Sequence, residues 1–318
     1  MKPLSPGTRL CVPISRRALL AAAAGFALPR GGAAAPTRII FIAGRKSHGY
    51  GQHGHNSGSL LIAQMLRQSL PGVEAVVCQD GWPADESVLE NAAAIVLYMD
   101  GGDQHPILPH LEKLNALMKK GTGLVALHYA LVIPKGGPGD FLLDNIGAYY
   151  ETHWSVNPQW TARFDTLPAH PITRGAKPFA IFDEWYFHMR FRENAPGITP
   201  ILTAVPPDGT REKEFGPHSG NPAVRAAKGQ PEHLAWAFQR PGRGRGFGFT
   251  GFHYNWSLAN DSFRAVLLNG IAWTAGLEIP AAGVCPHAPS WQEFLHVQEG
   301  QMPDGFSRDK AMQLIGPR

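Results

Sequence analysis

The sequence lacks several features that would assign it directly to a well-known class of protein. Its 318 residues contain no G-x-x-x-x-G-K-[ST] loop, so a P-loop nucleotide site is excluded. They contain no G-x-S-x-G elbow, so an α/β-hydrolase serine nucleophile is not indicated. Lys and Arg form no cluster in the body of the chain, and nucleic acid is therefore not an expected partner. The composition, 44% hydrophobic and 17% charged, is typical of a globular protein.

Long hydrophobic runs are also missing, apart from one short run near the N-terminus. Ser15 to Leu20 (SRRALL) resembles a twin-arginine export motif, and the apolar run from Ala18 to Leu28 is too short for a mature membrane-spanning helix. Ala33 to Ala35 offer a signal-peptidase site. We therefore predict a signal peptide over residues 1–35 and a periplasmic or secreted protein with no stable membrane anchor after cleavage. An uncleaved membrane anchor is the alternative.

Cysteine is scarce, with 3 in the chain, and Cys11 belongs to the predicted signal peptide. Cys78 and Cys285 remain in the mature protein. The periplasm permits disulfides, and a bond between these two would tie the C-terminal tail to the sheet. Two separate buried thiols are an equally good alternative.

The first half of the mature chain alternates between short apolar runs and amphipathic segments. The apolar runs, rich in β-branched residues, predict buried strands over residues 38–44, 73–78, 94–99 and 123–129. Helices are predicted between them, from Asn56 or Ser57 to about Leu70 and from Leu108 to Gly121. This alternation indicates an α/β fold with a Rossmann- or flavodoxin-like, doubly wound, mostly parallel sheet.

The second half is less regular. It predicts an extended stretch over residues 150–164 and a strand over 198–205. A hairpin is predicted over 234–252, around the turn Pro241-Gly242-Arg243-Gly244, and a closing helix over 261–275. The polar stretch 209–230 is expected to be a surface loop. We predict one α/β domain over residues 36–280, followed by a tail over 281–318 that packs on it.

Histidine is unusually abundant, with 14 in the chain. His48, His53 and His55 lie in a glycine-containing loop directly after the first predicted strand. Ligands of open α/β sheets bind beyond the carboxyl ends of the strands, and imidazoles placed there could bind a metal or orient sugar hydroxyl groups. A solvated loop whose histidines cap the next helix is the alternative.

Further polar and aromatic residues follow the other strands at the same expected edge. The candidates are, for acid–base chemistry, His128, Asp183, Glu184 and His253; for substrate binding, His48, His53, His55, Asp100, Tyr129, Trp154 and Tyr186; and for a metal, His128, His153 and His253. Imidazole and carboxylate groups suit Zn²⁺ or a similar ion, and aromatic faces suit a carbohydrate. Core packing explains Trp185, Tyr186 and Phe187 equally well, but it leaves two carboxylates that are costly to bury unpaired.

Six segments together resemble the ThuA-like (trehalose utilisation) family, on the class I glutamine amidotransferase-like fold. They are IIFIAGRKSHGYGQHGHNSG from Ile39, LHYA from Leu127, YYETHW from Tyr149, AHPI from Ala169, DEWY from Asp183 and GRGFGFTGFHYNW from Gly244. Amidotransferases of this fold carry a nucleophilic cysteine at the elbow that corresponds to Leu127-His128-Tyr129, and a histidine that corresponds to His253. No cysteine lies at that elbow, so glutaminase activity is not expected.

The resemblance implies a role in sugar utilisation. We expect an enzyme that acts on a small-molecule carbohydrate, either a sugar or an oxidised sugar. His128, Glu184 and His253 would carry out the acid–base chemistry, with a divalent metal, Zn²⁺ first among the candidates, as a cofactor. The alternative is a non-catalytic carbohydrate-binding protein that uses the same cleft. A homo-oligomer is compatible with the sequence.

Overall fold

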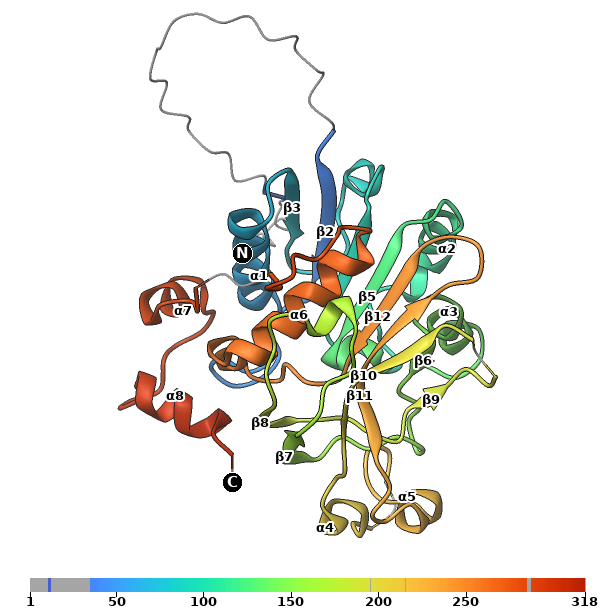
Figure 1. Cartoon of the computed structure of the whole chain (residues 1–318), viewed down its shortest axis with the longest axis vertical. Coiled ribbons are helices and arrows are strands. Elements are labelled where there is room, and N and C mark those ends of the chain that lie inside the picture. The colour runs from blue at the N-terminus through green and yellow to red at the C-terminus, as the bar shows by residue number, and fades with distance from the viewer. Residues whose placement is uncertain (1–10, 13–34, 195, 215, 285–286, 318) are drawn as a thin grey trace, which may run out of the picture.

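A computed structural model of the chain describes residues 11–12, 35–194, 196–214, 216–284 and 287–317. Its centre is an 8-stranded sheet in the order β1-β3-β2-β4-β5-β12-β11-β10 (Figure 1). The strands of this sheet are β1 (Cys11–Val12), β2 (Thr37–Ala43), β3 (Val73–Cys78), β4 (Ala94–Tyr98), β5 (Gly123–Leu127), β10 (Ile198–Ala204), β11 (Glu232–Gln239) and β12 (Arg245–Phe249). The neighbouring strands β3, β2, β4, β5 and β12 run parallel to one another. β1 pairs antiparallel with β3, β11 pairs antiparallel with β12, and β10 pairs antiparallel with β11. This confirms the predicted mostly parallel α/β fold.

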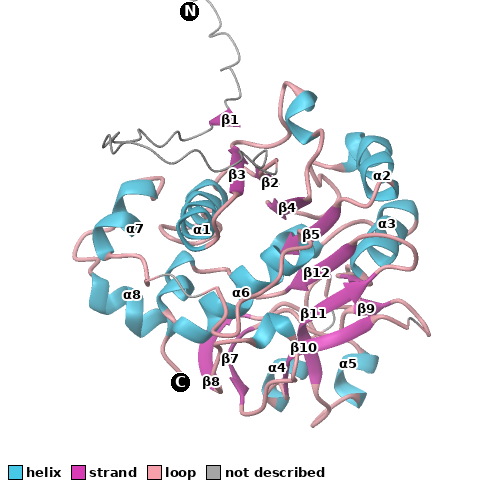
Figure 2. Cartoon of the chain, turned by 45° about the horizontal axis from the view of Figure 1, so that its top comes forward, coloured by secondary structure: helices cyan, strands magenta, loops and turns pink. Residues whose placement is uncertain are grey.

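Helices cover both faces of the sheet (Figures 1 and 2). α1 (His55–Ser69) and α6 (Asp261–Thr274) lie on one face, and α2 (Leu111–Lys119) and α3 (Gly137–Ile146) lie on the other. Strand β2 shows why both faces need cover. Its side chains alternate between the two cores, with Ile39 and Phe41 toward α1 and α6, and Ile40 and Ile42 toward α2 and α3. All four are fully buried, as in a central parallel strand.

Two small ribbons and several short helices complete the domain. β6 (Ala148–Tyr149) pairs with β9 (Arg190–Phe191), and β7 (Gln159–Phe164) pairs with β8 (Phe179–Glu184). Short 3₁₀ helices are η1 (Glu86–Leu89), η2 (Leu108–His110), η3 (His128–Leu131), η4 (Pro171–Thr173) and η5 (Asn255–Ala259). Strand β8 ends in Asp183 and Glu184, which lie at the carboxyl edge of the main sheet.

The predicted elements are largely confirmed, with differences that have local causes. Helix α1 begins at His55 behind a Gly54 N-cap that makes no side-chain cap, so neither Asn56 nor Ser57 caps it. The expected surface loop 209–230 contains α5 (Pro222–Ala226), and α4 (Asp208–Arg211) overlaps its start. Of the expected extended stretch 150–164, only its last part forms a strand. Helix α3 was not predicted, because its sequence GPGDFLLDNI opens with residues that usually mark loops.

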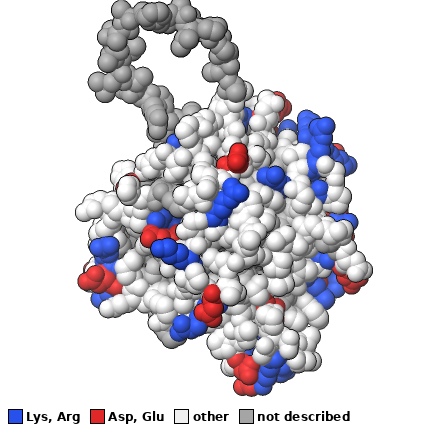
Figure 3. Space-filling model, in the orientation of Figure 1, with Lys and Arg blue, Asp and Glu red and all other residues white. Residues whose placement is uncertain are grey.

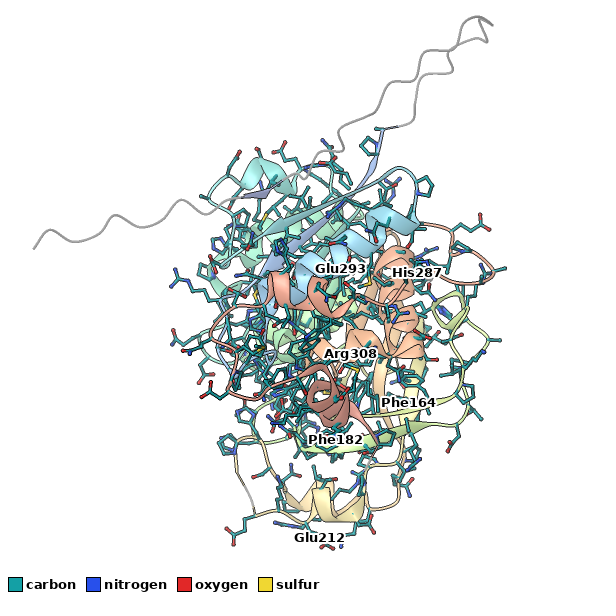
Figure 4. All side chains as sticks on the ribbon, turned by 90° about the vertical axis from the view of Figure 1, so that its left-hand side faces the viewer. Phe164, Phe182, Glu212, His287, Glu293 and Arg308 are labelled. Carbon is teal, nitrogen blue, oxygen red and sulfur yellow. The ribbon has the colours of Figure 1, made fainter. Side chains whose placement is uncertain are left out.

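The described part of the C-terminal tail forms α7 (Trp291–Val297) and α8 (Arg308–Ile315). Figure 4 looks onto this face, with Glu293 marking α7 and Arg308 marking the start of α8. The side chain of Gln64 on α1 donates a hydrogen bond of 2.8 Å to Glu293, which ties α7 to the domain.

The structure leaves the two predictions about the chain ends open. Most of the predicted signal peptide lies outside the described residues, and so does Cys285; Cys78 is buried in β3. Within the described residues, no helix combines the length and the apolar character needed to cross a bilayer.

Candidate functional site

Four side chains that are far apart in the sequence meet at the carboxyl edge of the sheet. Each offers one atom of a type that binds metals, and together they form what we call the histidine group: His53, His128, Glu184 and His253. The four atoms all lie within 4.8 Å of one another. They come from the loop after β2, the end of β5, the end of β8 and the loop after β12. Three of these four residues were predicted to be catalytic.

His128 enters the group because the chain turns sharply after β5. Its φ of 53° lies in the left-handed region, so the strand ends at Leu127 instead of continuing to Tyr129. Nδ1 of His128 lies 2.8 Å from the carbonyl oxygen of Thr250. A carbonyl only accepts, so Nδ1 carries a proton, and Nε2 is the nitrogen that faces the group.

His53 is oriented in the same way by a carboxylate. Its Nδ1 lies 2.9 Å from Oδ1 of Asp100, which follows β4. Because an ionised carboxylate only accepts, Nδ1 carries the proton and the lone pair lies on Nε2. Burial lowers the pKa of His53, and the hydrogen bond to Asp100 only partly opposes that shift. The imidazole is therefore neutral, held by the kind of carboxylate partner that often supports a metal-binding histidine.

Four of the six separations between the ligand atoms are close to those around a tetrahedral ion. Nε2 of His53 lies 3.1 Å from Nε2 of His128 and 3.0 Å from Nδ1 of His253. Oε2 of Glu184 lies 3.3 Å from Nε2 of His128 and 3.2 Å from Nδ1 of His253. Ligands bound at roughly 2.0–2.1 Å to a tetrahedral zinc ion are about 3.3 Å apart. Imidazole nitrogen and carboxylate oxygen are ligand types that zinc prefers, so this donor set fits a divalent metal.

Glu184 differs from the three imidazoles in its exposure. Its side chain is 15% exposed, whereas those of His53, His128 and His253 are 2%, 0% and 5% exposed. Burial alone would raise the pKa of Glu184. Hydrogen bonds and charge interactions with His128 and His253 outweigh burial and hold the pKa below its ordinary value. Glu184 is therefore a carboxylate at neutral pH, and it is the member of the group that most readily meets a ligand from solvent.

Asp183, predicted as a catalytic residue, has a different place in the structure. It is fully buried, and its carboxylate accepts hydrogen bonds from the backbone N–H groups of Phe252 and His253 and from the hydroxyl of Ser257. Burial raises the pKa of Asp183, against the opposing effect of His128 and His253. It does not reach the surface of the site. Its contacts fix the loop that carries His253, so Asp183 is a positioning residue.

The structure brings most of the predicted substrate-binding residues to the group. His48 is exposed, with its ring centroid 3.7 Å from that of His53, and the ring of half-buried Tyr129 lies 5.6 Å from His53. The hydroxyl of buried Tyr186 lies 3.2 Å from Nε2 of His128. Nε2 of buried His55 faces Asp100 at 3.6 Å. These residues define the surroundings of the predicted site.

Two predicted residues lie elsewhere. His153, predicted as a metal ligand, is exposed, and among the described residues it does not join either cluster of metal-ligating groups. The φ of His153 is 67°, and its backbone N–H donates a hydrogen bond to the carbonyl oxygen of Pro217. His153 therefore lies in a turn and does not follow the end of a strand. Trp154 packs between the guanidinium of Arg190, 3.5 Å from its ring, and the ring of His188, at 4.5 Å.

Two residues near Glu184 were not predicted. The amide of Asn157 lies 3.5 Å from Oε1 of Glu184, and His218 bonds through Nδ1 to the hydroxyl of Tyr150 at 3.0 Å. Burial lowers the pKa of His218, and the charge of Glu184 raises it. His218 comes from the polar stretch expected to be a surface loop, and its sequence context has no strand end that would have indicated it.

A cleft of about 510 Å³ adjoins the histidine group through Asp100. It lies over the carboxyl ends of β2, β3 and β4, and its lining mixes polar and apolar residues: Gly44, Arg45, Asp80, Gly81, Trp82, Asp100, Gln104, Pro106, Pro109 and His110. Charged and amide groups of this kind can bond the hydroxyl groups of a hydrophilic ligand.

The fold and the site together define a doubly wound α/β protein with a histidine-rich centre at the carboxyl edge of its sheet. A family model described as ThuA, trehalose utilisation, matches residues 40–274, and the chain belongs to this family. That membership places the protein in the context of carbohydrate utilisation.

Comparison with solved structures gives similar folds at low sequence identity. A ThuA-like protein from Bacteroides uniformis is 14% identical with a TM-score of 0.51, over 78% of this chain and 95% of that one. A ThuA-like protein from Parabacteroides merdae is 15% identical with a TM-score of 0.50, over 81% and 99%. A glutamine amidotransferase from Thermotoga maritima is 9% identical with a TM-score of 0.41, over 75% and 96%. Comparison with curated proteins finds no match.

Proposed function

We propose that this protein is an exported enzyme that acts on a sugar or an oxidised sugar by metal-assisted acid–base chemistry at the histidine group. The observation that carries the proposal is the convergence of three imidazole nitrogens and one carboxylate oxygen, with the Nδ1 protons of His53 and His128 directed outward to Asp100 and Thr250. A site of this kind is costly to maintain in a buried environment without a ligand.

In this proposal the three imidazoles and Glu184 have different roles. His53, His128 and His253 hold the divalent ion, because they are almost fully buried and Asp100 and Thr250 engage the second nitrogens of His53 and His128. A bound divalent ion would polarise a carbonyl or hydroxyl oxygen of the substrate. Glu184 takes up or returns a proton of the substrate, since it is ionised and the most exposed of the four.

Tyr186 and Asp100 support this division of roles. The Tyr186 hydroxyl lies 3.2 Å from Nε2 of His128, and burial raises the pKa of Tyr186 well above its ordinary value. The phenol therefore stays protonated and can donate to an anionic oxygen of the substrate. Asp100 keeps His53 in the tautomer that ligates a metal.

Proton exchange provides the most general test. The metal-loaded protein is incubated in D₂O with a panel of sugars and keto-sugars, and loss of a C–H signal is followed by proton NMR. We expect exchange or product formation with at least one member, and a decrease of about 10²–10⁴-fold in Glu184→Gln, which keeps the size of the side chain but removes the base. Glutamine should not be hydrolysed, because no cysteine lies at the elbow.

A non-catalytic carbohydrate-binding protein is the second candidate. The cleft beside Asp100 favours it, since the charged and amide side chains in its lining can recognise hydroxyl groups without chemistry. Saturable sugar binding without exchange or turnover by the metal-loaded protein would establish this function in place of the enzyme.

A further inference from the structure

The opposite end of the sheet holds a buried cation without an anionic partner. Arg240 follows β11 and is 6% exposed. Its guanidinium donates hydrogen bonds to the side chain of Asn145, at 2.7 Å, and to the carbonyl oxygen of Thr122, while its Nε has no partner. Among the described residues, no carboxylate lies within ion-pair distance of it. Burial lowers the pKa of Arg240 to about 10, without any opposing charge.

Arg240 borders an open cleft of about 500 Å³. The cleft is also lined by Lys119 at the end of α2, by Arg192, and by Arg243 in the turn between β11 and β12. Figure 3 shows Lys and Arg side chains gathered over α2 and this turn, at the upper right of the view. Of these four cations, within the described chain, only Arg192 forms an ion pair, with Asp144 at 2.7 Å.

The cleft is separate from the histidine group. Thr122 lies directly before β5 and Arg240 lies between β11 and β12, so the cleft faces the amino ends of the parallel strands. His128 and His253 follow the carboxyl ends of β5 and β12. A ligand in this cleft therefore does not contact the proposed catalytic residues.

We propose that this cleft binds a small tetrahedral oxyanion, either inorganic phosphate or the phosphate group of a small ester. Four guanidinium or ammonium groups against one carboxylate leave an excess of positive charge, and guanidinium forks match the oxygen spacing of phosphate. The anion supplies the charge that Arg240 lacks, at a place where solvent reaches the cleft but screens the buried guanidinium poorly.

The test is calorimetric titration of the purified full chain with sodium phosphate, at constant ionic strength set by sodium chloride. We expect saturable binding of one phosphate. Arg243→Gln and Lys119→Gln, both at exposed positions, should each weaken it by about tenfold or more, because each removes a charge-assisted contact. Lys310→Gln, on exposed α8 surface far along the chain, is the matched control and should bind as the parent does.

Two further arms complete the design. Arg240→Gln can keep a hydrogen bond to Asn145 and should lose phosphate binding. If this variant fails to fold, the phosphate affinities of Arg243→Gln and Lys119→Gln test the proposal without it. Titration with glucose 6-phosphate separates the sources: tighter binding than phosphate indicates an ester, and equal or weaker binding indicates the free anion. The proposal is overturned if phosphate gives no saturable heat, or if Arg243→Gln and Lys119→Gln both bind it as tightly as Lys310→Gln does.

Discussion

The two ends of the central sheet present opposite electrostatic situations. At the carboxyl end, three imidazole nitrogens and a carboxylate oxygen converge, and the Nδ1 protons of His53 and His128 point outward to Asp100 and Thr250. At the amino end, the buried guanidinium of Arg240 has only neutral acceptors. One end gathers atoms of the types that bind a cation, and the other has an excess of positive charge. Buried groups that are left uncompensated in this way indicate where a protein expects a ligand.

The ends also differ in how firmly the chain holds them. The histidine group is supported by a second layer of contacts, from Asp100 to His53, from Thr250 to His128 and from Asp183 to the His253 loop. The amino-end cleft is lined by exposed side chains around three buried residues, Met118, Asn145 and Arg240. We therefore expect tight and geometrically selective binding at the carboxyl end, and weaker, charge-driven binding at the amino end.

Removing a ligand of the histidine group should give the largest effect. We expect His128→Gln to lower the affinity for zinc by more than about 100-fold and to abolish activity, since a lost ligand exceeds the effect of its supporting contacts. The measurement is competition with a chelator of known affinity. The matched control is His105→Gln, because His105 is also buried and also bonds a backbone carbonyl, that of Ala130 at 3.1 Å. Equal loss of zinc in both variants would contradict the assignment of His128 as a ligand.

Weakening the support of a ligand should give a smaller effect. Asp100→Asn keeps the shape of the side chain but no longer fixes the tautomer of His53. We expect zinc affinity to fall by about 10–100-fold, the range typical of a lost outer partner. Asp103→Asn, an exposed change three residues away, should leave the affinity unchanged. An unaltered affinity in Asp100→Asn would mean that the carboxylate does not orient His53.

Asp183→Asn tests whether the carboxyl-end loop depends on its buried anchor. The new amide nitrogen would face the N–H groups of Phe252 and His253, which now donate to the carboxylate. We expect the free energy of unfolding to fall by about 1–3 kcal/mol, the cost of leaving buried groups unsatisfied. Urea denaturation measures it, with the exposed Asp165→Asn as the control. A loss no larger than that of the control would remove Asp183 from the positioning role.

The last effect concerns pH, at a buried histidine outside both regions. Burial lowers the pKa of His105 to about 4, whereas an exposed histidine titrates near 6.5. The unfolded chain therefore binds the proton first, so the stability from His105 is complete above about pH 6.5 and is lost as the pH falls toward about 4. Each such proton contributes a slope of up to about 1.4 kcal/mol per pH unit.

His105→Gln should therefore lower the slope of the free energy of unfolding against pH, on the acid side, by up to the contribution of one proton. Part of the slope should remain in the variant, because burial also lowers the pKa of His55 to about 4. Urea denaturation at several pH values between 4 and 7 gives the slope. An identical slope in parent and variant would show that His105 does not titrate differently on folding.

Much of the fold could be predicted from sequence, because its signals are local. The strands around Ile39, Val96 and Val125 are continuous apolar runs, and the closing helix has both a regular apolar face and a Gly276 stop with a φ of 80°. Helix α3 escaped prediction because its first turn is built from Gly and Pro, and packing against the sheet outweighs those weak propensities.

The site was predictable in part, for a different reason. The rule that parallel strands end at one edge brought together His128 and His253, but it cannot tell which loop side chain turns inward. His53 enters the group because its φ of 42° and its bond to Asp100 aim the ring, whereas His48 in the same loop stays exposed. The different roles of Asp183 and Glu184, adjacent in sequence, follow from their alternation along β8, which sends one side chain into the core and the other into the site.

The central claim is that His53, His128 and His253 together bind a divalent metal. The most direct measurement is a crystal structure of the zinc-loaded protein, with anomalous diffraction recorded on both sides of the zinc edge. The account predicts one strong anomalous peak with Nε2 of His53, Nε2 of His128 and Nδ1 of His253 at roughly 2.0–2.1 Å. It also predicts that the Glu184→Gln protein keeps this peak. No peak at the histidine group, or a zinc ion bound only by His48 and Asp100, would contradict it.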